Sequence, residues 1–305
     1  MIKENIPNEI YHNKEHYPAI SSSDLKKILI SPRTFKDSLT EKKETTPAMN
    51  FGSAFHDYNQ SILETGFEWQ FESEWNIFEH PRNPKTGEPV GKTTIAYANA
   101  YESAKIGKVG AISDFEYIEL QHMHKSFEKH PATRLFFGKG KDVKFEQSYF
   151  VNDNGVEQKV RPDRETERYI FDVKTCKGGD SSIYEVSRII DNFNYDLSAA
   201  MYQWLVYRET GIFKRFVWIF IENEYPYQVN YHYADDFAYK IRKLYNGGFE
   251  YEAKLGATRY KRAIEVYKKC VELNQWQGTD VFINNKFRVG TPQPRNYMIL
   301  PEYTL

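Results

Sequence analysis

The sequence has few cysteines, no long apolar run and almost no net charge. Its two cysteines, Cys176 and Cys270, exclude a four-cysteine zinc site or iron–sulfur cluster and provide no disulfide framework. No run of about 18 apolar residues occurs and the N-terminus has no apolar signal segment, so the sequence predicts a cytoplasmic protein without a membrane span. With a formal net charge of −1, binding to nucleic acid would need a local basic patch.

The chain length and composition fit an ordinary globular protein. A chain of 305 residues can bury a sizeable core in one large domain or two small ones. Charged residues make up 27% and hydrophobic residues 40%, which is typical of this class. The aromatic content is high at 16%, which a tyrosine-rich core and surface explains more simply than a special function.

Helical patterns dominate the first part of the chain, and short β-rich runs separated by turn residues follow. Helices are predicted at 23–30, 47–66, 93–107, 113–129, 181–190 and 196–210, with mostly helix over 234–275. The segment 66–91 is predicted as a long loop with room for one strand. Strands are predicted at 143–151, 156–163 and 168–175, forming an antiparallel meander, and again at 213–222 and 227–234.

This order of elements predicts an α/β domain with a helical N-terminal elaboration. We expect residues 1–47 to form the elaboration and residues 48–250 to form the core. Residues 251–305 are expected to add a C-terminal helix, followed by an extended arm over 276–305.

One short stretch, RPDRETERYIFDVKT at 161–175, has residue types suited to cutting phosphodiesters. Two divalent metal ions held by carboxylates can activate water and stabilise the charge of the leaving oxygen, and Mg²⁺ prefers such oxygen ligands. Strand alternation places Asp172 and Lys174 on one face. A turn after Asp163 can bring its carboxylate beside Asp172, where Lys174 would orient or activate the attacking water.

The Asp-x-Lys pattern alone is weak, because it also occurs at Asp24–Lys26 and Asp142–Lys144. Each occurrence taken alone is more simply a solvated charge pair worth about 0–1 kcal/mol. Only Asp172–Lys174 lies in an apolar β-rich run with Pro-Asp upstream across a turn. This context singles it out.

Together, these residues resemble the PD-(D/E)xK nuclease motif, specifically the RecE (exodeoxyribonuclease VIII) branch and more distantly lambda exonuclease. Four further stretches agree in order along the chain, so that the resemblance covers roughly 20–235: SSSDLKKILISPRTF, NFGSAFHDYN, HPATRLFFGKGKDVKFEQSYF and YDLSAAMY. The resemblance implies a restriction-endonuclease-like core, in which helices flank a central mixed β-sheet. It also implies that Asp163, Asp172 and the backbone carbonyl of Val173 bind metal, and that Lys174 lies beside the nucleophilic water.

The resemblance implies further site residues outside this stretch. His56 would be an additional metal ligand, although without the resemblance a satisfied buried histidine would be the simpler interpretation. Glu146 falls where the family carries a glutamate near the metals. Independently of the resemblance, Arg33, Arg161 and Lys177 are candidates for phosphate contacts, each at least as well explained as solvated surface.

The sequence departs from the family on the helix after the catalytic lysine. Related nucleases carry Gln-x-x-x-Tyr there, and in YDLSAAMY the tyrosine is Tyr202 whereas Ser198 stands at the glutamine position. A shifted copy of the motif exists at Gln203–Tyr207. Either Ser198 has taken over the contact or the contact is lost.

The activity implied is a Mg²⁺-dependent exodeoxyribonuclease, with Mn²⁺ as a substitute, acting on linear double-stranded DNA ends. By resemblance to RecE it would run 5′→3′, release 5′-mononucleotides and leave a 3′ single strand for an annealing protein in phage-type recombination. The family also implies a homo-oligomeric ring and the cytoplasm of a bacterium or phage-infected host.

Three other functions remain open at this stage. The same core would suit an endonuclease or single-strand nuclease, and Ser198 would suit a DNA-end-binding protein that no longer cleaves. An NTPase is a weaker alternative, because GEPVGKTT at 87–94 is one residue short of the Walker spacing and follows no hydrophobic strand.

Overall fold

The computed structural model describes residues 1–278 except 5, 42–45, 138–142 and 244–248, together with 282–283 and 286–287. Most of the C-terminal arm predicted over 276–305 therefore lies outside the described residues. Its two described pieces are short antiparallel strands, β13 (Phe282–Ile283) and β14 (Lys286–Phe287). None of the described helices is both long and apolar enough to cross a membrane.

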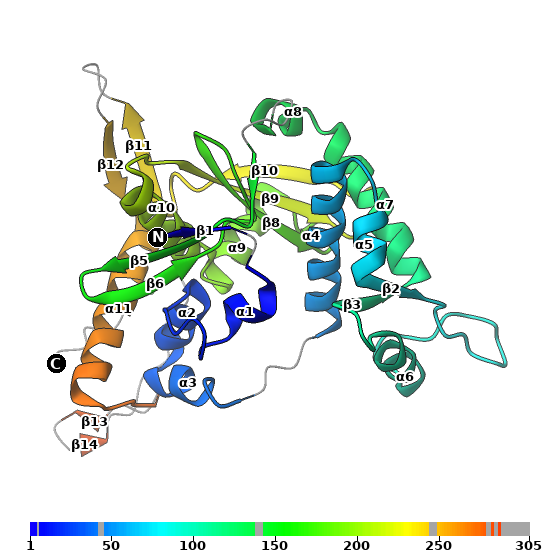
Figure 1. Cartoon of the computed structure of the whole chain (residues 1–305), viewed down its shortest axis with the longest axis horizontal. Helices are drawn as coiled ribbons and strands as arrows, with labels where there is room; N and C mark the ends of the chain where they lie inside the picture. Colours follow the sequence, from blue (N-terminus) through cyan, green and yellow to red (C-terminus); the bar gives the residue numbers. More distant parts are fainter. Residues whose placement is uncertain are drawn as a thin grey trace.

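A five-stranded mixed sheet forms the centre of the fold, in the order β10-β9-β8-β7-β4. Figure 1 shows β8, β9 and β10 side by side at the centre of the molecule. Its strands are β4 (Lys144–Phe145), β7 (Arg164–Glu165), β8 (Tyr169–Cys176), β9 (Arg215–Glu222) and β10 (Val229–Tyr233). β8 and β9 pair in parallel, whereas the other neighbours are antiparallel. A parallel pair needs a long crossover, which α9 (Ile183–Asn192) and α10 (Tyr195–Thr210) supply. The predicted α/β class with a central mixed sheet is confirmed.

A second sheet contains β1 (Ile2–Lys3), β5 (Ser148–Asp153) and β6 (Val156–Val160), paired in the order β1-β5-β6. The predicted three-strand meander is therefore wrong: β5 and β6 form a hairpin, but β6 does not pair with β8. The chain leaves the second sheet at Pro162, which has no amide hydrogen to donate to a ladder, and enters the central sheet as β7.

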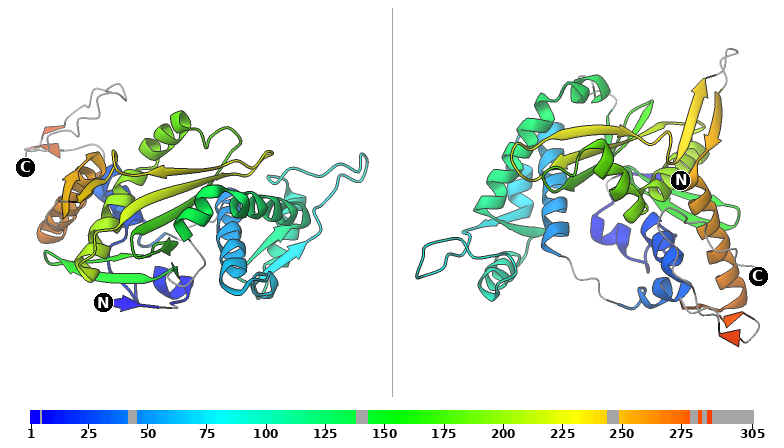
Figure 2. Two further views of the ribbon diagram at one scale, coloured as in Figure 1. Left: turned by 90° about the horizontal axis from the view of Figure 1, so that it is seen from above. Right: turned by 180° about the vertical axis from the view of Figure 1, so that it is seen from behind.

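One face of the central sheet is covered by α4 (Pro47–Thr65) and α7 (Asp114–Lys129), which stay together on one side in all views (Figures 1 and 2). Capping by Ser113, with a capping box through Glu116, begins α7 as the sequence predicts. Alternation along β8 sends Phe171 and Val173 toward these helices. They join one apolar cluster with Phe55 of α4.

The opposite face of the sheet packs on α10, which also contacts β5 and β6. Around α10 lie α2 (Ser22–Ile30), α3 (Pro32–Asp37) and α11 (Leu255–Leu273), the orange helix in Figure 2. Trp218 and Ile170 of the sheet share one buried cluster with Leu25 of α2 and Tyr149 of the second sheet. Residues 1–47 thus contribute side chains to the same core as the sheet.

The N-terminal segment is held on the second sheet by buried polar contacts. The ammonium of Lys159 donates to the backbone carbonyls of Tyr11 (2.5 Å) and Tyr17 (3.0 Å), and burial lowers the pKa of Lys159 to about 8. The guanidinium of Arg161 lies 3.9 Å from the ring centre of Tyr11. These contacts fix α1 (Asn8–His12) beside strand β6 of the second sheet.

Two regions differ from the sequence prediction. The segment 66–91 contains α5 (Trp69–Glu74) and β2 (Trp75–Phe78). β2 pairs in parallel with β3 (Gly110–Ser113), and α6 (Ile95–Ala104) lies between these two strands in the sequence. Within 234–275, predicted as mostly helix, β11 (Tyr239–Lys243) and β12 (Phe249–Ala253) form an antiparallel hairpin before α11. The remaining described helix is α8 (Pro131–Phe137).

The segment 87–94 lies in the loop that projects from the molecule between β2 and α6 (Figure 1). An antiparallel bridge between Arg82 and Pro89 closes this loop, and strand β2 ends at Phe78, before the bridge and well before Gly87. A phosphate-binding loop follows its strand directly, so the geometry disfavours the NTPase alternative.

Candidate active site

The site is built on the part of strand β8 whose outer edge is paired with no strand of the described residues. β7 is only two residues long and pairs with Ile170 and Phe171, so the edge beyond it is open at Val173. The amide of Val173 donates to Oδ2 of Asp163 at 2.7 Å, and its carbonyl oxygen lies 3.0 Å from Nε2 of His56. The backbone of β8 therefore holds the Asp163 carboxylate at the strand edge.

Asp172 and Lys174 lie on one face of β8, as alternation predicts, and their side chains form an ion pair of 2.7 Å. Burial raises the pKa of Asp172, Lys174 opposes that rise and the nearby charge of Asp163 adds to it. For Lys174, burial alone would lower the pKa, but the carboxylates of Asp172 and Asp163 raise it above its ordinary value. Lys174 is thus a firmly protonated ammonium between two carboxylates.

His56 reaches the same strand edge from helix α4. The helix comes close to β8 at Gly52, where a β-carbon would lie 3.4 Å from Oγ1 of Thr175. One turn later His56 faces the strand, with Nδ1 at 3.6 Å from Oδ2 of Asp163. Its side chain is 27% exposed, so it is a histidine at the edge of the site and not one enclosed in the core.

Glu146 lies on the other side of Asp163, in a strained backbone conformation. Its φ of 42° is in the left-handed region, which costs a non-glycine residue about 1 kcal/mol or more and persists where neighbours impose it. Its amide donates to the carbonyl of Asp163 at 3.3 Å. Burial raises the pKa of Glu146; Arg161, at 3.8 Å, opposes the rise and Asp163 adds to it.

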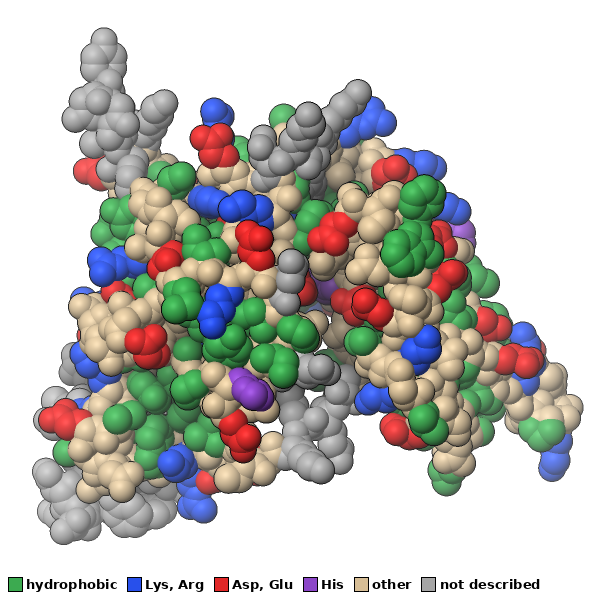
Figure 3. Space-filling model, in the orientation of Figure 1, with side chains coloured by type: hydrophobic (Ala, Val, Ile, Leu, Met, Phe, Trp, Pro, Cys, Tyr) green, Lys and Arg blue, Asp and Glu red, His purple; other side chains and the backbone are tan. Residues whose placement is uncertain are grey.

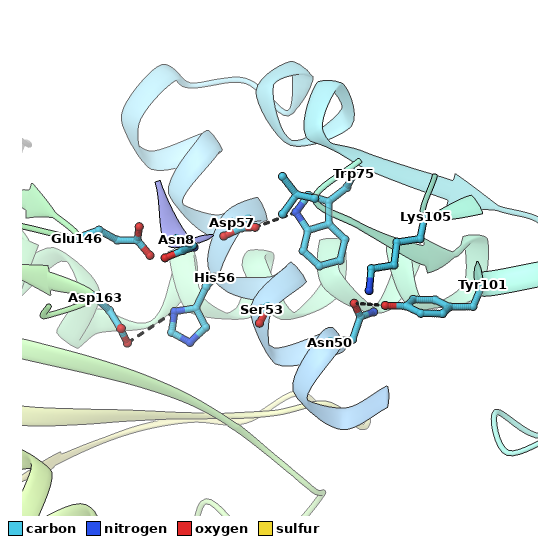
Figure 4. A pocket seen from close by; sticks show the side chains of 11 residues that line it. Asn8, Asn50, Ser53, His56, Asp57, Trp75, Tyr101, Lys105, Glu146 and Asp163 are labelled. Atoms are coloured by element: carbon cyan, nitrogen blue, oxygen red, sulfur yellow. Dashed lines mark hydrogen bonds and ion pairs between the residues drawn. The ribbon is translucent and has the colours of Figure 1, made fainter. Parts of the chain in front are cut away.

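A cavity of about 360 Å³ opens next to these side chains (Figure 4). The surface is hollowed there, near the centre of the face in Figure 3, and acidic side chains gather at its rim. The cavity is lined by Asn8, Asn50, Ser53, His56, Asp57, Trp75, Tyr101, Lys105, Val109, Glu146 and Asp163. Asp172 and Lys174 do not line it, because they lie on the α10 side of β8. The edge of β8 therefore divides the site into two parts: the cavity with His56, Glu146 and Asp163, and the opposite side with Asp172 and Lys174.

Asp57 is a cavity residue that the sequence did not single out. Its Oδ2 accepts a hydrogen bond of 2.8 Å from the indole of Trp75. Burial raises the pKa of Asp57 to about 7; the bond from Trp75 opposes the rise and the charge of Glu146 adds to it. No spacing in the sequence points to this contact between α4 and β2.

This pKa predicts a pH effect on stability. Asp57 binds its proton more tightly in the folded protein than in the unfolded chain. Its ionisation should therefore lower the free energy of unfolding by up to about 4 kcal/mol as pH rises from about 4 to 7. Asp57→Asn keeps an acceptor for Trp75 and cannot ionise. In EDTA, we expect the melting temperature of the wild type to fall more than that of the variant between pH 5 and pH 8. Parallel curves for the two proteins would contradict this prediction.

Tyr202 of α10 is close enough to the carboxylates to feel their charge. Burial raises the pKa of Tyr202 well above its ordinary value, and the charges of Tyr11, Asp172 and Asp163 add to the rise. Gln203 points elsewhere: it is buried, donates to the carbonyl of Lys214 at 3.0 Å and accepts from an amide of the β11 strand. The shifted motif at Gln203–Tyr207 is therefore structural, and Tyr202 is the tyrosine beside the site.

The three predicted phosphate-binding residues have different surroundings. Arg161 is buried and donates to Oγ of Ser148, Oδ1 of Asn8 and the carbonyl of Ile6, each at 2.9 Å. It holds the N-terminal segment, and the predicted phosphate contact would require these bonds to break. Arg33 and Lys177 are exposed and open to solvent.

The structure also places Lys26 near the site. The sequence suggested that Lys26 forms a solvent-exposed charge pair with Asp24. That interpretation is wrong: Asp24 caps α2 and pairs with Lys14 at 2.5 Å. The Lys26 ammonium instead lies 4.7 Å from the ring centre of Tyr195, and Lys174 lies 5.3 Å from the same ring. Burial and the nearby charge of Lys174 lower the pKa of Lys26 to about 8.

The residues at the strand edge fit a hard divalent cation. In the described part of the chain, no three His, Cys, Asp or Glu side chains form a ready-made metal-binding group. A ligand set drawn from this strand edge would combine the carbonyl of Val173 with the carboxylates of Asp163 and Asp172 and the imidazole of His56. Burial and the charge of Asp163 raise the pKa of Asp172, and a bound cation would offset that unfavourable charge.

Residues 21–277 match a family described as PDDEXK-like domain of unknown function (DUF3799). No curated protein matches the chain. The chain is similar to a crystal structure from Eubacterium rectale, provisionally named as an exonuclease, with TM-score 0.53 and 12% identity over 96% of this chain and 97% of that one. A second structure, SSO0001, aligns at TM-score 0.25 and 12% identity over 85% and 89% of the two chains, too low for a fold comparison.

Proposed function

Because the chain belongs to the family of PDDEXK-like domains, we propose that it is a divalent-metal-dependent nuclease that cleaves DNA. The observation that carries the proposal is the meeting of Asp163, Asp172 and Lys174 at Val173 of strand β8. Two carboxylates, a backbone carbonyl and an ammonium within one strand segment match what phosphodiester hydrolysis requires.

In this proposal, divalent metal ions, when bound, would supply an activated water and stabilisation of the charge on the phosphate. Asp163 and Asp172 would hold them, with the carbonyl of Val173 and the ring of His56. Lys174 has a raised pKa and stays protonated at neutral pH, so it would orient the water or bind a phosphate oxygen and would not act as a base. Tyr202 would lie near Asp172, whose charge helps to raise the pKa of Tyr202.

The finer assignment follows the RecE-like stretches of the sequence. We propose Mg²⁺ as the metal, linear double-stranded DNA as the substrate and 5′→3′ degradation to mononucleotides. The remaining 3′ strand would serve a single-strand-annealing protein, and the working form would be a ring of several copies. The resemblance in order along the chain supports these points.

End-labelled DNA tests the proposal. Linear duplex labelled separately at its 5′ and 3′ ends would be incubated with the protein in Mg²⁺ and in EDTA. Early release of the 5′ label as a mononucleotide in Mg²⁺ alone, while the 3′ label stays on long strands, is the expected result. Cleavage of closed circular DNA would show that the protein is an endonuclease and not an exonuclease. No cleavage with Mg²⁺ or Mn²⁺ by a folded protein would overturn the proposal.

His56→Ala is expected to weaken metal binding by about 10-fold or more, because it removes one member of a small ligand set. The measurement is Mn²⁺ binding by isothermal titration calorimetry, which needs no DNA. His122→Ala, an exposed histidine of α7, is the matched control and should bind as the wild type does. Equal affinities for the His56 variant and the wild type would make His56 a structural residue.

A further inference from the structure

Two ammonium groups share one aromatic ring beside the carboxylates, but only one of them has an acidic partner. Lys174 pairs with Asp172 at 2.7 Å, whereas Lys26 makes no ion pair or hydrogen bond with the residues that the structure describes. Both ammonium groups lie over the ring of Tyr195. The Lys26 side chain, only partly exposed, therefore brings to the site an ammonium that no described carboxylate contacts, although the charges of Asp172 and Asp196 act on it from farther away.

Helix α2 imposes this arrangement. Residues two positions apart in a helix point to different sides, so Asp24 turns toward Lys14 and the helix N-terminus while Lys26 faces strand β8. The helix is fixed by Leu25 and Ile28, which are buried in the core beneath it. Lys26 cannot swing to Asp24 for compensation without unwinding α2.

A partly buried ammonium without a counter-ion is unfavourable unless an anion from outside joins it. The site is already expected to receive an anion, because a nuclease must bind the phosphodiester that it cuts. Aromatic rings attract cations over their faces, so Tyr195 holds both ammonium groups in place on the same side of β8.

We infer that Lys26 and Lys174, supported by Tyr195, form a binding position for one phosphodiester of the DNA strand on the α2 side of β8. This inference rests on the proposed nuclease function and assigns Lys26 as a substrate-binding residue. Lys174 then has two neighbours of opposite charge, Asp172 and the phosphate, and Lys26 has one.

The salt dependence of DNA degradation tests this inference. Each phosphate contact contributes about 0.9 to the slope of log affinity against log salt for duplex DNA. Lys26→Gln should lower the slope of log kcat/KM between about 50 and 200 mM KCl by this amount and raise KM about 10-fold, with a smaller change in kcat. Lys26→Arg should restore most of the slope. Should Lys26→Gln fail to fold, Lys26→Met keeps the apolar stem and serves instead.

Lys27→Gln is the matched control, because Lys27 is the next residue of α2 and donates to Oγ of Ser38, away from the site. It should keep the wild-type slope and KM. If the wild type degrades DNA and Lys26→Gln has an unchanged salt slope and KM, the inference is overturned and the proposed function stands. If the wild type degrades no DNA in Mg²⁺ or Mn²⁺, the proposed function fails and the inference with it.

Discussion

Asp172→Asn is expected to reduce DNA cleavage by about 10³-fold or more while leaving the fold intact. The carboxylate of Asp172 is the group closest to Lys174, and in the proposed mechanism it holds metal. An amide of the same shape cannot provide the negative charge. Its oxygen can still accept a hydrogen bond from Lys174, so the loss should be chemical and not structural.

The fold should tolerate this change for a specific reason. Burial already raises the pKa of Asp172, which means that the folded protein disfavours the charge that the amide removes. The melting temperature in EDTA should therefore be equal to or above that of the wild type. Lys174→Met is less suitable as a first variant, because it leaves Asp172 and Asp163 facing each other without a cation.

The measurement is the rate of release of labelled nucleotides from linear duplex DNA in Mg²⁺. Asp236→Asn, an exposed carboxylate with one surface ion pair, is the control and should degrade DNA at the wild-type rate. An Asp172→Asn variant as active as this control would show that the chemistry occurs elsewhere on the molecule.

Arg259→Met is expected to lower the free energy of unfolding by about 3–5 kcal/mol. The guanidinium, 3% exposed, donates to Asp196 at 2.9 Å and to Asp191 at 2.7 Å, joining α11 to α10 and α9. Asp196 is 2% exposed, so removal of Arg259 leaves a buried carboxylate without its cation. Close packing here cannot relax, since a β-carbon at Gly256 would already lie 2.3 Å from the Asp196 carbonyl.

The sign of the pH dependence gives a second check. Burial raises the pKa of Asp196 even with Arg259 present, and without Arg259 the rise should be larger. A raised folded pKa means that stability is lost as pH increases through it, so the defect should be smaller at pH 5 than at pH 8. Urea unfolding of the variant and the wild type at pH 5 and pH 8 measures this loss in the free energy of unfolding.

Two further variants serve as controls for position on the helix and for the unpaired charge. Lys261→Met, on the exposed side of the same helix, should change the free energy of unfolding by less than about 0.5 kcal/mol. The double change Arg259→Met with Asp196→Asn should recover much of the loss, because the unpaired charge is gone. A full loss that the double variant does not reduce would assign the effect to packing and not to charge.

Local sequence rules predicted how the side chains lie around strand β8. Strand alternation placed Asp172 and Lys174 on one face, and the turn after Asp163 brought that carboxylate to the strand edge. His56 lies a long way off in sequence, so only the resemblance pointed to it. Lys26 was missed although its signal was present: in a predicted helix, two residues at spacing i and i+2 cannot face each other, so Asp24 and Lys26 could not be a pair.

The errors in the fold have a common cause. The hairpin of β11 and β12 depends on packing of Tyr239 and Tyr251 against Phe213, contacts that no local pattern encodes. The division of β5 and β6 from β8 likewise depends on partners distant in the chain. Sheet pairing is set by such non-local burial, whereas capped amphipathic helices such as α7 are readable from their own residues.

The unpaired edge of β8 has a consequence for how the molecule avoids self-association. An exposed strand edge is a template on which another chain can add a strand, and proteins protect such edges with charges or by filling the ladder positions. Here the Asp163 carboxylate accepts the hydrogen bond from the amide of Val173, and the ring of His56 contacts the carbonyl of Val173. The side chains that we assign to cleavage thus also seal the sheet, and no intruding strand can extend it at Val173 without first displacing them.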